Sequence, residues 1–206
     1  MKNRDEEIVR TLTNKVRVLA VQQAARVWWS DTRWGRSRAK QTLLELAIED
    51  LLRVRRVLSR PIRRLTEPLA AWHVGSQTPD FASLVRLLHR RAMVPAKMLS
   101  VVFATEKSFA LFSSHRVATI KLTQMTHDLH VSEVFLHYRD HGLAEAWLSE
   151  DQLPADWPMR ERPDAVLLNW RKTIVHAIEY GGDYPIERLL ELHNGLATAE
   201  LSYELW

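Results

Sequence analysis

One stretch of the chain, residues 33–64, changes its apolar periodicity from helical to alternating within a single run of arginines. Apolar residues at 44, 47, 48 and 51 follow the i, i+3, i+4, i+7 spacing of a helix, which we expect to begin near Ser37 and end near Leu52. The opposite face of that helix would consist of Arg38, Thr42, Glu45, Glu49 and Arg53. From Leu52 to Pro61, apolar residues are interspersed with arginines, which predicts a strand or short ribbon.

Two further helices are predicted before this stretch, over residues 4–12 and 15–29. Helix, helix, turn, helix and basic ribbon is the layout of a winged helix-turn-helix, whose third helix enters the major groove of duplex DNA. Residues 33–64 hold ten basic and three acidic side chains, a balance of +7. The pattern therefore predicts a DNA-binding module. A solvated basic face, an RNA-binding surface and a surface for an acidic protein partner are the alternatives.

The expected DNA contacts divide by position along this stretch. The N-terminal end of the third helix can reach base edges, where arginine pairs bidentately with guanine and glutamine with adenine. The ribbon is better placed to clamp phosphates, which set affinity and register but read no sequence. The expected base-reading residues are Arg36, Arg38, Gln41 and Thr42, and the expected phosphate clamps are Arg53, Arg55, Arg56 and Arg60. Arg33 and Lys40 complete the expected interface.

Charge is divided unevenly along the chain. Residues 1–100 hold 20 basic and 9 acidic side chains, whereas residues 101–206 hold 9 basic and 16 acidic ones. The split predicts two modules, a basic one over 1–95 and an acidic one over 96–206. The absence of cysteine excludes disulfides and thiol nucleophiles. There is no apolar run of about 18 residues and no signal peptide, so we expect a cytoplasmic protein that does not contact membranes.

The second half predicts a helix over 124–141, three short strands, a helix from Pro185 and a final strand at 202–206. This α-β-β-β-α-β order is that of the PD-(D/E)XK nuclease-like core, in which an Asp and a Glu-X-Lys bind Mg²⁺ and activate water. The matching candidates here are Asp164 on the second strand, Glu179 on the third, and Glu150 after the first. Gly181 stands where active enzymes carry the lysine, which favours a non-catalytic core used for structure or dimerisation.

The segment from Thr126 to Leu136, His-Asp-Leu-His-Val-Ser-Glu-Val-Phe after the threonine, resembles the His-Asp-Leu helix of the replication-relaxation proteins of bacterial plasmids and integrated mobile elements. The spacing onward to 147–151, Pro163-Asp164-Ala165, 178–182 and 203–206 is similar too. The resemblance covers about residues 12–206. It implies a winged-helix half joined to a nuclease-like half, in a protein that binds DNA during replication, mobilisation or regulation of the element.

Together these features predict an α+β protein that binds double-stranded DNA sequence-specifically. We expect a transcriptional regulator or a replication accessory of a bacterial mobile element, associated with plasmid or nucleoid. A homodimer is expected, because one recognition helix reads few base pairs and paired half-sites are the usual remedy. No cofactor and no small-molecule substrate are expected. Two alternatives stay open: a Mg²⁺-dependent nuclease using Asp164 and Glu179, and an adaptor whose basic half docks an acidic protein.

Overall fold

The computed structural model describes residues 2–113, 120–157, 159 and 161–206. It has mixed α+β structure, as the sequence predicts, and the chain divides into two compact units. Unit 1 comprises Met1–Ile62 and Ala96–Leu136; unit 2 comprises Arg63–Pro95 and His137–Trp206. The boundary expected between residues 95 and 96 is therefore only the point at which the chain returns from unit 2 to unit 1. A module made of residues 1–95 would mix parts of both units.

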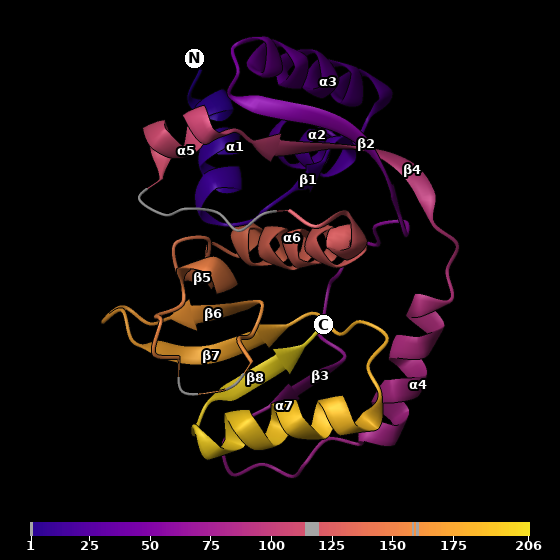
Figure 1. Cartoon of the computed structure of the whole chain (residues 1–206), viewed down its shortest axis with the longest axis vertical. Helices are drawn as coiled ribbons and strands as arrows, with labels where there is room; N and C mark the ends of the chain where they lie inside the picture. The colour runs from indigo at the N-terminus through magenta and orange to yellow at the C-terminus, as the bar shows by residue number, and fades with distance from the viewer. Residues whose placement is uncertain (1, 114–119, 158, 160) are drawn as a thin grey trace. The chain divides into compact units, whose positions relative to one another are not determined.

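Unit 1 contains helices and a three-stranded antiparallel sheet (Figure 1). The first elements are α1 (Asn3–Asn14), β1 (Leu19–Ala20), α2 (Val21–Trp28), α3 (Arg33–Ile48) and β2 (Leu52–Ser59). After the excursion into unit 2 follow β4 (Lys97–Ala104), α5 (Glu106–Phe112), the short 3-10 helix η1 (Leu122–Gln124) and α6 (Met125–Asp140), whose last four residues belong to unit 2. The strand order is β1-β4-β2, so β4 is central and β2 is an edge.

The second predicted helix is shorter than expected, and the third has the expected length but begins and ends four residues earlier. The helix predicted over 15–29 is only α2, because Leu19 and Ala20 pair with Val102 and Val101 of β4 instead. Helix α3 begins at Arg33, four residues before the expected start, with the Thr32 hydroxyl accepting the Gly35 N–H at 3.0 Å. The sequence also predicts a strand over 117–122, of which residues 117–119 lie outside the described residues and Leu122 begins η1.

The predicted inward face of α3 is wrong for Leu44 and Ile48, although Leu51, just after the helix, is buried as expected. Its buried residues are Gly35, Ala39, Leu43 and Leu46, whereas Leu44 is 43% and Ile48 is 85% exposed. The helix has apolar side chains on both faces, so periodicity alone did not distinguish them. Gly35 allows the first turn of α3 to approach Ser30 closely, since a Cβ at position 35 would lie 2.3 Å from the Ser30 carbonyl oxygen.

A buried polar layer joins α6 to the rest of unit 1. The Glu133 carboxylate, 1% exposed, pairs with Arg26 at 2.8 Å and accepts the Gln23 side-chain N–H at 3.0 Å. Asp128, also buried, lies 3.7 Å from Arg17 and from His127. Buried charges are tolerated when paired and hydrogen-bonded. The polar residues of the His-Asp-Leu segment therefore hold the fold of unit 1 together.

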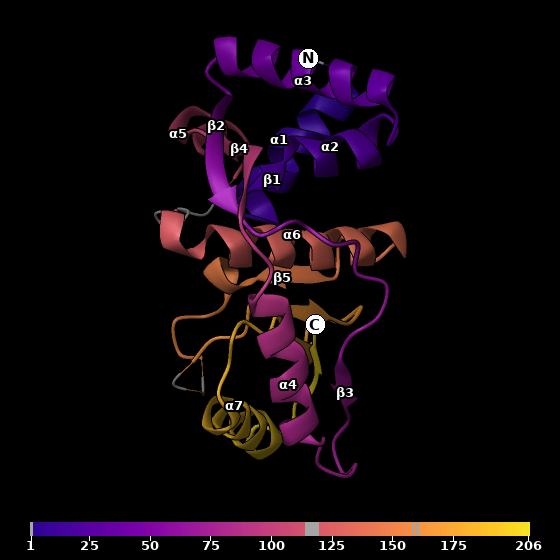
Figure 2. The ribbon, with the colours of Figure 1, turned by 90° about the vertical axis from the view of Figure 1, so that its right-hand side faces the viewer.

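Unit 2 is built on a five-stranded mixed sheet. Its elements are β3 (Ala70–Trp72), α4 (Phe81–Ala92), β5 (Trp147–Ser149), the 3-10 helix η2 (Glu150–Gln152), β6 (Ala165–Leu168), β7 (Ile174–Glu179), α7 (Ile186–Thr198) and β8 (Ser202–Leu205). The strand order is β3-β8-β7-β6-β5, with only β7 and β8 parallel. Helices α4 and α7 contact each other (Figure 2). The predicted order α-β-β-β-α-β from residue 124 onward is present.

Two apolar clusters fill unit 2. One joins α4, α7 and β8 through Phe81, Leu84, Leu88, Leu189 and Leu205. The other contains Trp72, Leu192, Leu196 and Tyr203. His193 lies beside this second cluster: its ring is 5.0 Å from the Trp72 ring, and Nδ1 lies 3.1 Å from the Tyr203 hydroxyl. Near the end of α7, the sequence predicts that His193 is a cation stabilised by the helix dipole, but burial lowers its pKa, so it is a neutral core residue instead.

Candidate nucleic-acid interface and carboxylate cluster

The charge split sharpens when it is counted by unit. Unit 1 holds 18 basic and 10 acidic residues, a balance of +8, and unit 2 holds 11 basic and 15 acidic residues, a balance of −4. Within unit 1, the cations expected on α3 are all exposed: Arg33, Arg36, Arg38 and Lys40. Since α3 starts at Arg33, these four residues occupy its first two turns. The positive end of the helix dipole adds to their field.

Side chains along α3 hold one another in place. Arg38 Nη1 donates to Gln41 Oε1 at 3.4 Å, and Gln41 Nε2 donates to Glu45 Oε1 at 3.1 Å. The Arg38 guanidinium also lies 5.8 Å from the ring centroid of Trp34, which is 65% exposed. Arg36 pairs with Asp31 at 2.8 Å. Thr42 is half-buried, so of the four expected base-reading residues it is the least accessible.

Strand β2, which carries the other expected cations, contacts α3 (Figure 1). Arg53, Arg55 and Arg56 are exposed and pair with Phe103, Val101 and Ser100 of β4. Strand alternation places Arg53 and Arg55 on one face of the sheet and Arg56 on the other. Arg60 is different: it lies past the end of the strand, half-buried, and its backbone N–H donates to the Thr126 hydroxyl at 3.1 Å.

Several exposed apolar residues on the same unit were not expected. Trp34, Leu44 and Ile48 are exposed on α3, and Leu58 and Met98 face solvent opposite each other on β2 and β4. The change from helical to alternating periodicity predicts where the helix ends and the strand begins, but it does not predict which apolar side chains are exposed to solvent. That depends on where α3 packs, as described above.

The carboxylates expected in the second half do converge. Asp164 accepts the Tyr180 N–H at 2.7 Å, and Glu179 accepts the Tyr184 hydroxyl at 2.8 Å. Burial, followed by the nearby charges of Glu179, Asp164 and Glu150, raises the pKa of the Tyr184 hydroxyl far above its usual range. Tyr184 thus stays protonated and donates to the cluster. The sequence predicts only a strand-to-helix turn over 180–184, and a residue in a turn has no strand register from which the direction of its side chain could be inferred.

Gly181 follows this cluster and faces the core. A Cβ at this position would lie 2.5 Å from Leu88 Cδ2 and 3.2 Å from Leu205 Cδ1. Both leucines are buried. A lysine here would begin its side chain inside that apolar packing, so the role of the missing lysine could not be restored by a single substitution.

Within the described parts of the chain, no group of three or more His, Asp or Glu side chains is arranged to hold a metal ion. Asp164 directs one oxygen to a backbone N–H, and Glu179 directs one to a phenol. On α6, His130 Nδ1 lies 2.7 Å from the Thr126 carbonyl oxygen, an interaction within its own helix.

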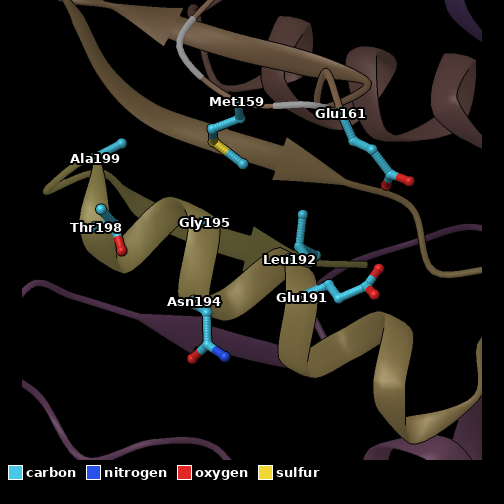
Figure 3. Close-up of a pocket in the computed structure, with 8 residues that line it drawn as sticks. All are labelled: Met159, Glu161, Glu191, Leu192, Asn194, Gly195, Thr198 and Ala199. Carbon is cyan, nitrogen blue, oxygen red and sulfur yellow. The ribbon is translucent and has the colours of Figure 1, made fainter.

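A groove on α7 was not expected from the sequence. It has a volume of about 630 Å³ and lies between α7 and the side chains of Met159 and Glu161 (Figure 3). Met159 points toward the helix, where Gly195 leaves room for its methyl group. The remaining lining residues are Glu161, Glu191, Leu192, Asn194, Thr198 and Ala199. The glycine in the middle of a helix was the one sequence signal for it.

Comparisons of the chain with protein-family models, with curated proteins and with solved structures find no match. The resemblance to replication-relaxation proteins therefore stays a prediction. None of the helices within the described residues is long and apolar enough to cross a membrane.

Proposed function

We propose that unit 1 is a winged helix-turn-helix that binds double-stranded DNA sequence-specifically. Its elements follow the order α1-β1-α2-α3-β2-β4, and its sheet has the order β1-β4-β2 expected of that fold. The observation that carries the proposal is the exposure of the basic residues at the start of α3 and along the adjoining strand β2. An exposed basic helix of this kind fits a major groove about 12 Å wide.

In this proposal the two elements have different tasks. Arg36, Arg38 and Gln41 on α3 read base edges, and the hydrogen bond between Arg38 and Gln41 limits the freedom that each loses on binding. Arg53, Arg55 and Arg56 neutralise phosphates. Because these three lie on both faces of an edge strand, they suit two backbones flanking the groove. Arg60, held by Thr126, has a lesser role than the sequence suggests.

Unit 2 would be a nuclease-like core that has kept its carboxylates as structural groups. We propose that it carries the dimer contact, since two copies of the +8 unit repel each other. A symmetric dimer would present two α3 helices to half-sites roughly 34 Å apart. A dimer of this kind would suit the role of a transcriptional regulator or of a replication accessory protein.

Binding-site selection from random duplexes, followed by fluorescence anisotropy with the selected site, tests the proposal. With about six phosphate contacts, log K should fall with log salt at a slope near −5. Arg38→Ala should cost about 1–3 kcal/mol on the selected site and relax its sequence preference. Arg55→Ala should weaken all duplexes alike.

Arg90→Ala is the matched control, because Arg90 is an exposed arginine on α4 of unit 2. It should leave duplex binding unchanged. A flat salt response, or equal losses for Arg38→Ala and Arg90→Ala, would contradict the proposal. Failure to shift any duplex at low salt would favour the adaptor alternative instead.

A further inference from the structure

The turn between β6 and β7 is held rigidly by one asparagine. Asn169 Oδ1 accepts the Arg171 N–H at 2.9 Å, the Thr173 N–H at 3.1 Å and the Thr173 hydroxyl at 2.9 Å. Backbone bonds between Asn169 and Thr173 and between Lys172 and Asn169 close the same turn, with Lys172 in the left-handed region at φ 61°. We call residues 169–173 the hairpin tip. Its shape is fixed before any partner arrives.

This rigid tip presents the most exposed tryptophan of the protein. Trp170 is 81% exposed, while Trp72, Trp147 and Trp206 in the same unit are almost fully buried. A large aromatic ring that is exposed to water does not add the hydrophobic free energy that its burial would contribute to the stability of the fold. No packing role within unit 2 accounts for the ring.

Two cations accompany the ring. The Arg171 guanidinium lies 4.5 Å from the Trp170 ring centroid, in cation–π range, and Lys172 is exposed beside it. An aromatic platform with adjacent cations is what proteins use to stack an unpaired nucleobase while neutralising its phosphate. Unit 2 as a whole carries a net charge of −4, so these two adjacent cations at the tip contrast with the charge of the unit.

We propose that the hairpin tip binds single-stranded nucleic acid, with a base stacked on Trp170 and the flanking phosphates held by Arg171 and Lys172. A membrane surface fits less well, because Val175 (46% exposed) is the only exposed large apolar neighbour within the hairpin. The site goes beyond the proposed duplex binding by unit 1. It would let the protein engage strands that have been opened.

Anisotropy titration of the full chain with fluorescein-labelled single-stranded oligothymidylate tests the site. Trp170→Ala should weaken binding about 5- to 150-fold, the loss expected for one stacked base. Trp170→Phe should retain most of the affinity, because phenylalanine still offers an aromatic face. Replacing both Arg171 and Lys172 with Gln should reduce the salt slope by about 1.4, for two phosphate contacts with a single strand.

Arg90→Gln removes an exposed cation elsewhere on unit 2 and should have no effect on oligothymidylate. Trp170→Ala should also leave duplex binding unchanged, so failure of this site is distinguishable from failure of the proposed duplex function. The inference is overturned if Trp170→Ala changes single-strand affinity less than twofold. It is equally overturned if the substitution instead abolishes self-association or binding to anionic phospholipid vesicles.

Discussion

At the scale of single residues, substitutions of Gly181 can test whether this part of unit 2 has a structural or a catalytic role. Gly181→Ala would press a methyl group against Leu88, which is 1% exposed. We expect a loss of about 1–3 kcal/mol in the free energy of unfolding, as for other overpacked cores. Urea denaturation measures it. In a Leu88→Ala background the same change should cost less, and equal costs in both backgrounds would show that the two residues do not interact.

Asp164 gives a second test of that account. Because it accepts the Tyr180 N–H, Asp164→Ala should lower the melting temperature even in EDTA. The stability loss should be about 1–3 kcal/mol, the cost of leaving a buried donor unpaired. Supercoiled plasmid incubated with Mg²⁺ or Mn²⁺ provides the opposing observation. Metal-dependent cleavage by the wild type that Asp164→Ala abolishes, with unchanged stability, would support the nuclease alternative.

His193 predicts a pH dependence. Burial lowers its pKa in the folded state, so the unfolded chain binds more protons below the ordinary value of about 6.5. The stability contributed by neutral His193 is present above that pH and is lost as the pH falls below it. His193→Gln should therefore reduce the slope of stability against pH between about 6.5 and 5. Parallel curves for wild type and variant would contradict a buried neutral histidine.

At the scale of elements, α3 allows a matched comparison of adjacent leucines. Leu43 is 1% exposed and Leu44 is 43% exposed. Leu43→Ala should cost about 2–5 kcal/mol of unfolding free energy, as buried leucines do. Leu44→Ala should cost less than about 1 kcal/mol. Thermal and urea denaturation measure both. A larger loss of unfolding free energy for Leu44→Ala than for Leu43→Ala would support the inward face of α3 that the sequence predicted.

The same helix shows why only part of the fold could be predicted. The order of the elements from 124 onward was predicted correctly because turn residues such as Pro163 and Pro185 separate them, but β5 lies later than the strand predicted over 143–148, and α7 extends beyond the predicted end at His193. Strands β1 and β3 were missed, since two or three residues carry no periodicity and their partners lie far along the chain. The sequence could predict that Asp164 and Glu179 lie close together, because the register of their strands defines their positions. It could not predict that Tyr184 joins them, because the position of Tyr184 depends on the path of a loop.

At the scale of the whole molecule, the two units share the chain in an interleaved way. A fragment of residues 1–95 lacks β4, the central strand of the unit 1 sheet, and should not fold. Joining 1–62 to 96–136 with a short turn should fold, because Ser59 and Lys97 are paired neighbours. Circular dichroism and proteolysis compare the two fragments. Equal protection of both would show that β4 is dispensable.

Sedimentation of the full chain tests the proposed dimer. We expect a mass twice that of the monomer, retained when Arg53, Arg55 and Arg56 are replaced with Ala, because the dimer contact is proposed in unit 2. A monomer at micromolar concentration, or dissociation caused by those unit 1 substitutions, would contradict it. Footprint length on the selected DNA gives an independent check.

The pairing of β3 with β8 has a consequence for biosynthesis. Ala70 pairs with Leu205, so β3 leaves the ribosome long before its only neighbour in the sheet has been translated. Unit 1 can close its own sheet once Ala104 has emerged, while β3 and α4 must wait with their apolar faces uncovered. Synthesis therefore imposes a fixed sequence of folding events, in which the basic unit matures first. Nascent chains stalled between these two points would be the ones that need a chaperone.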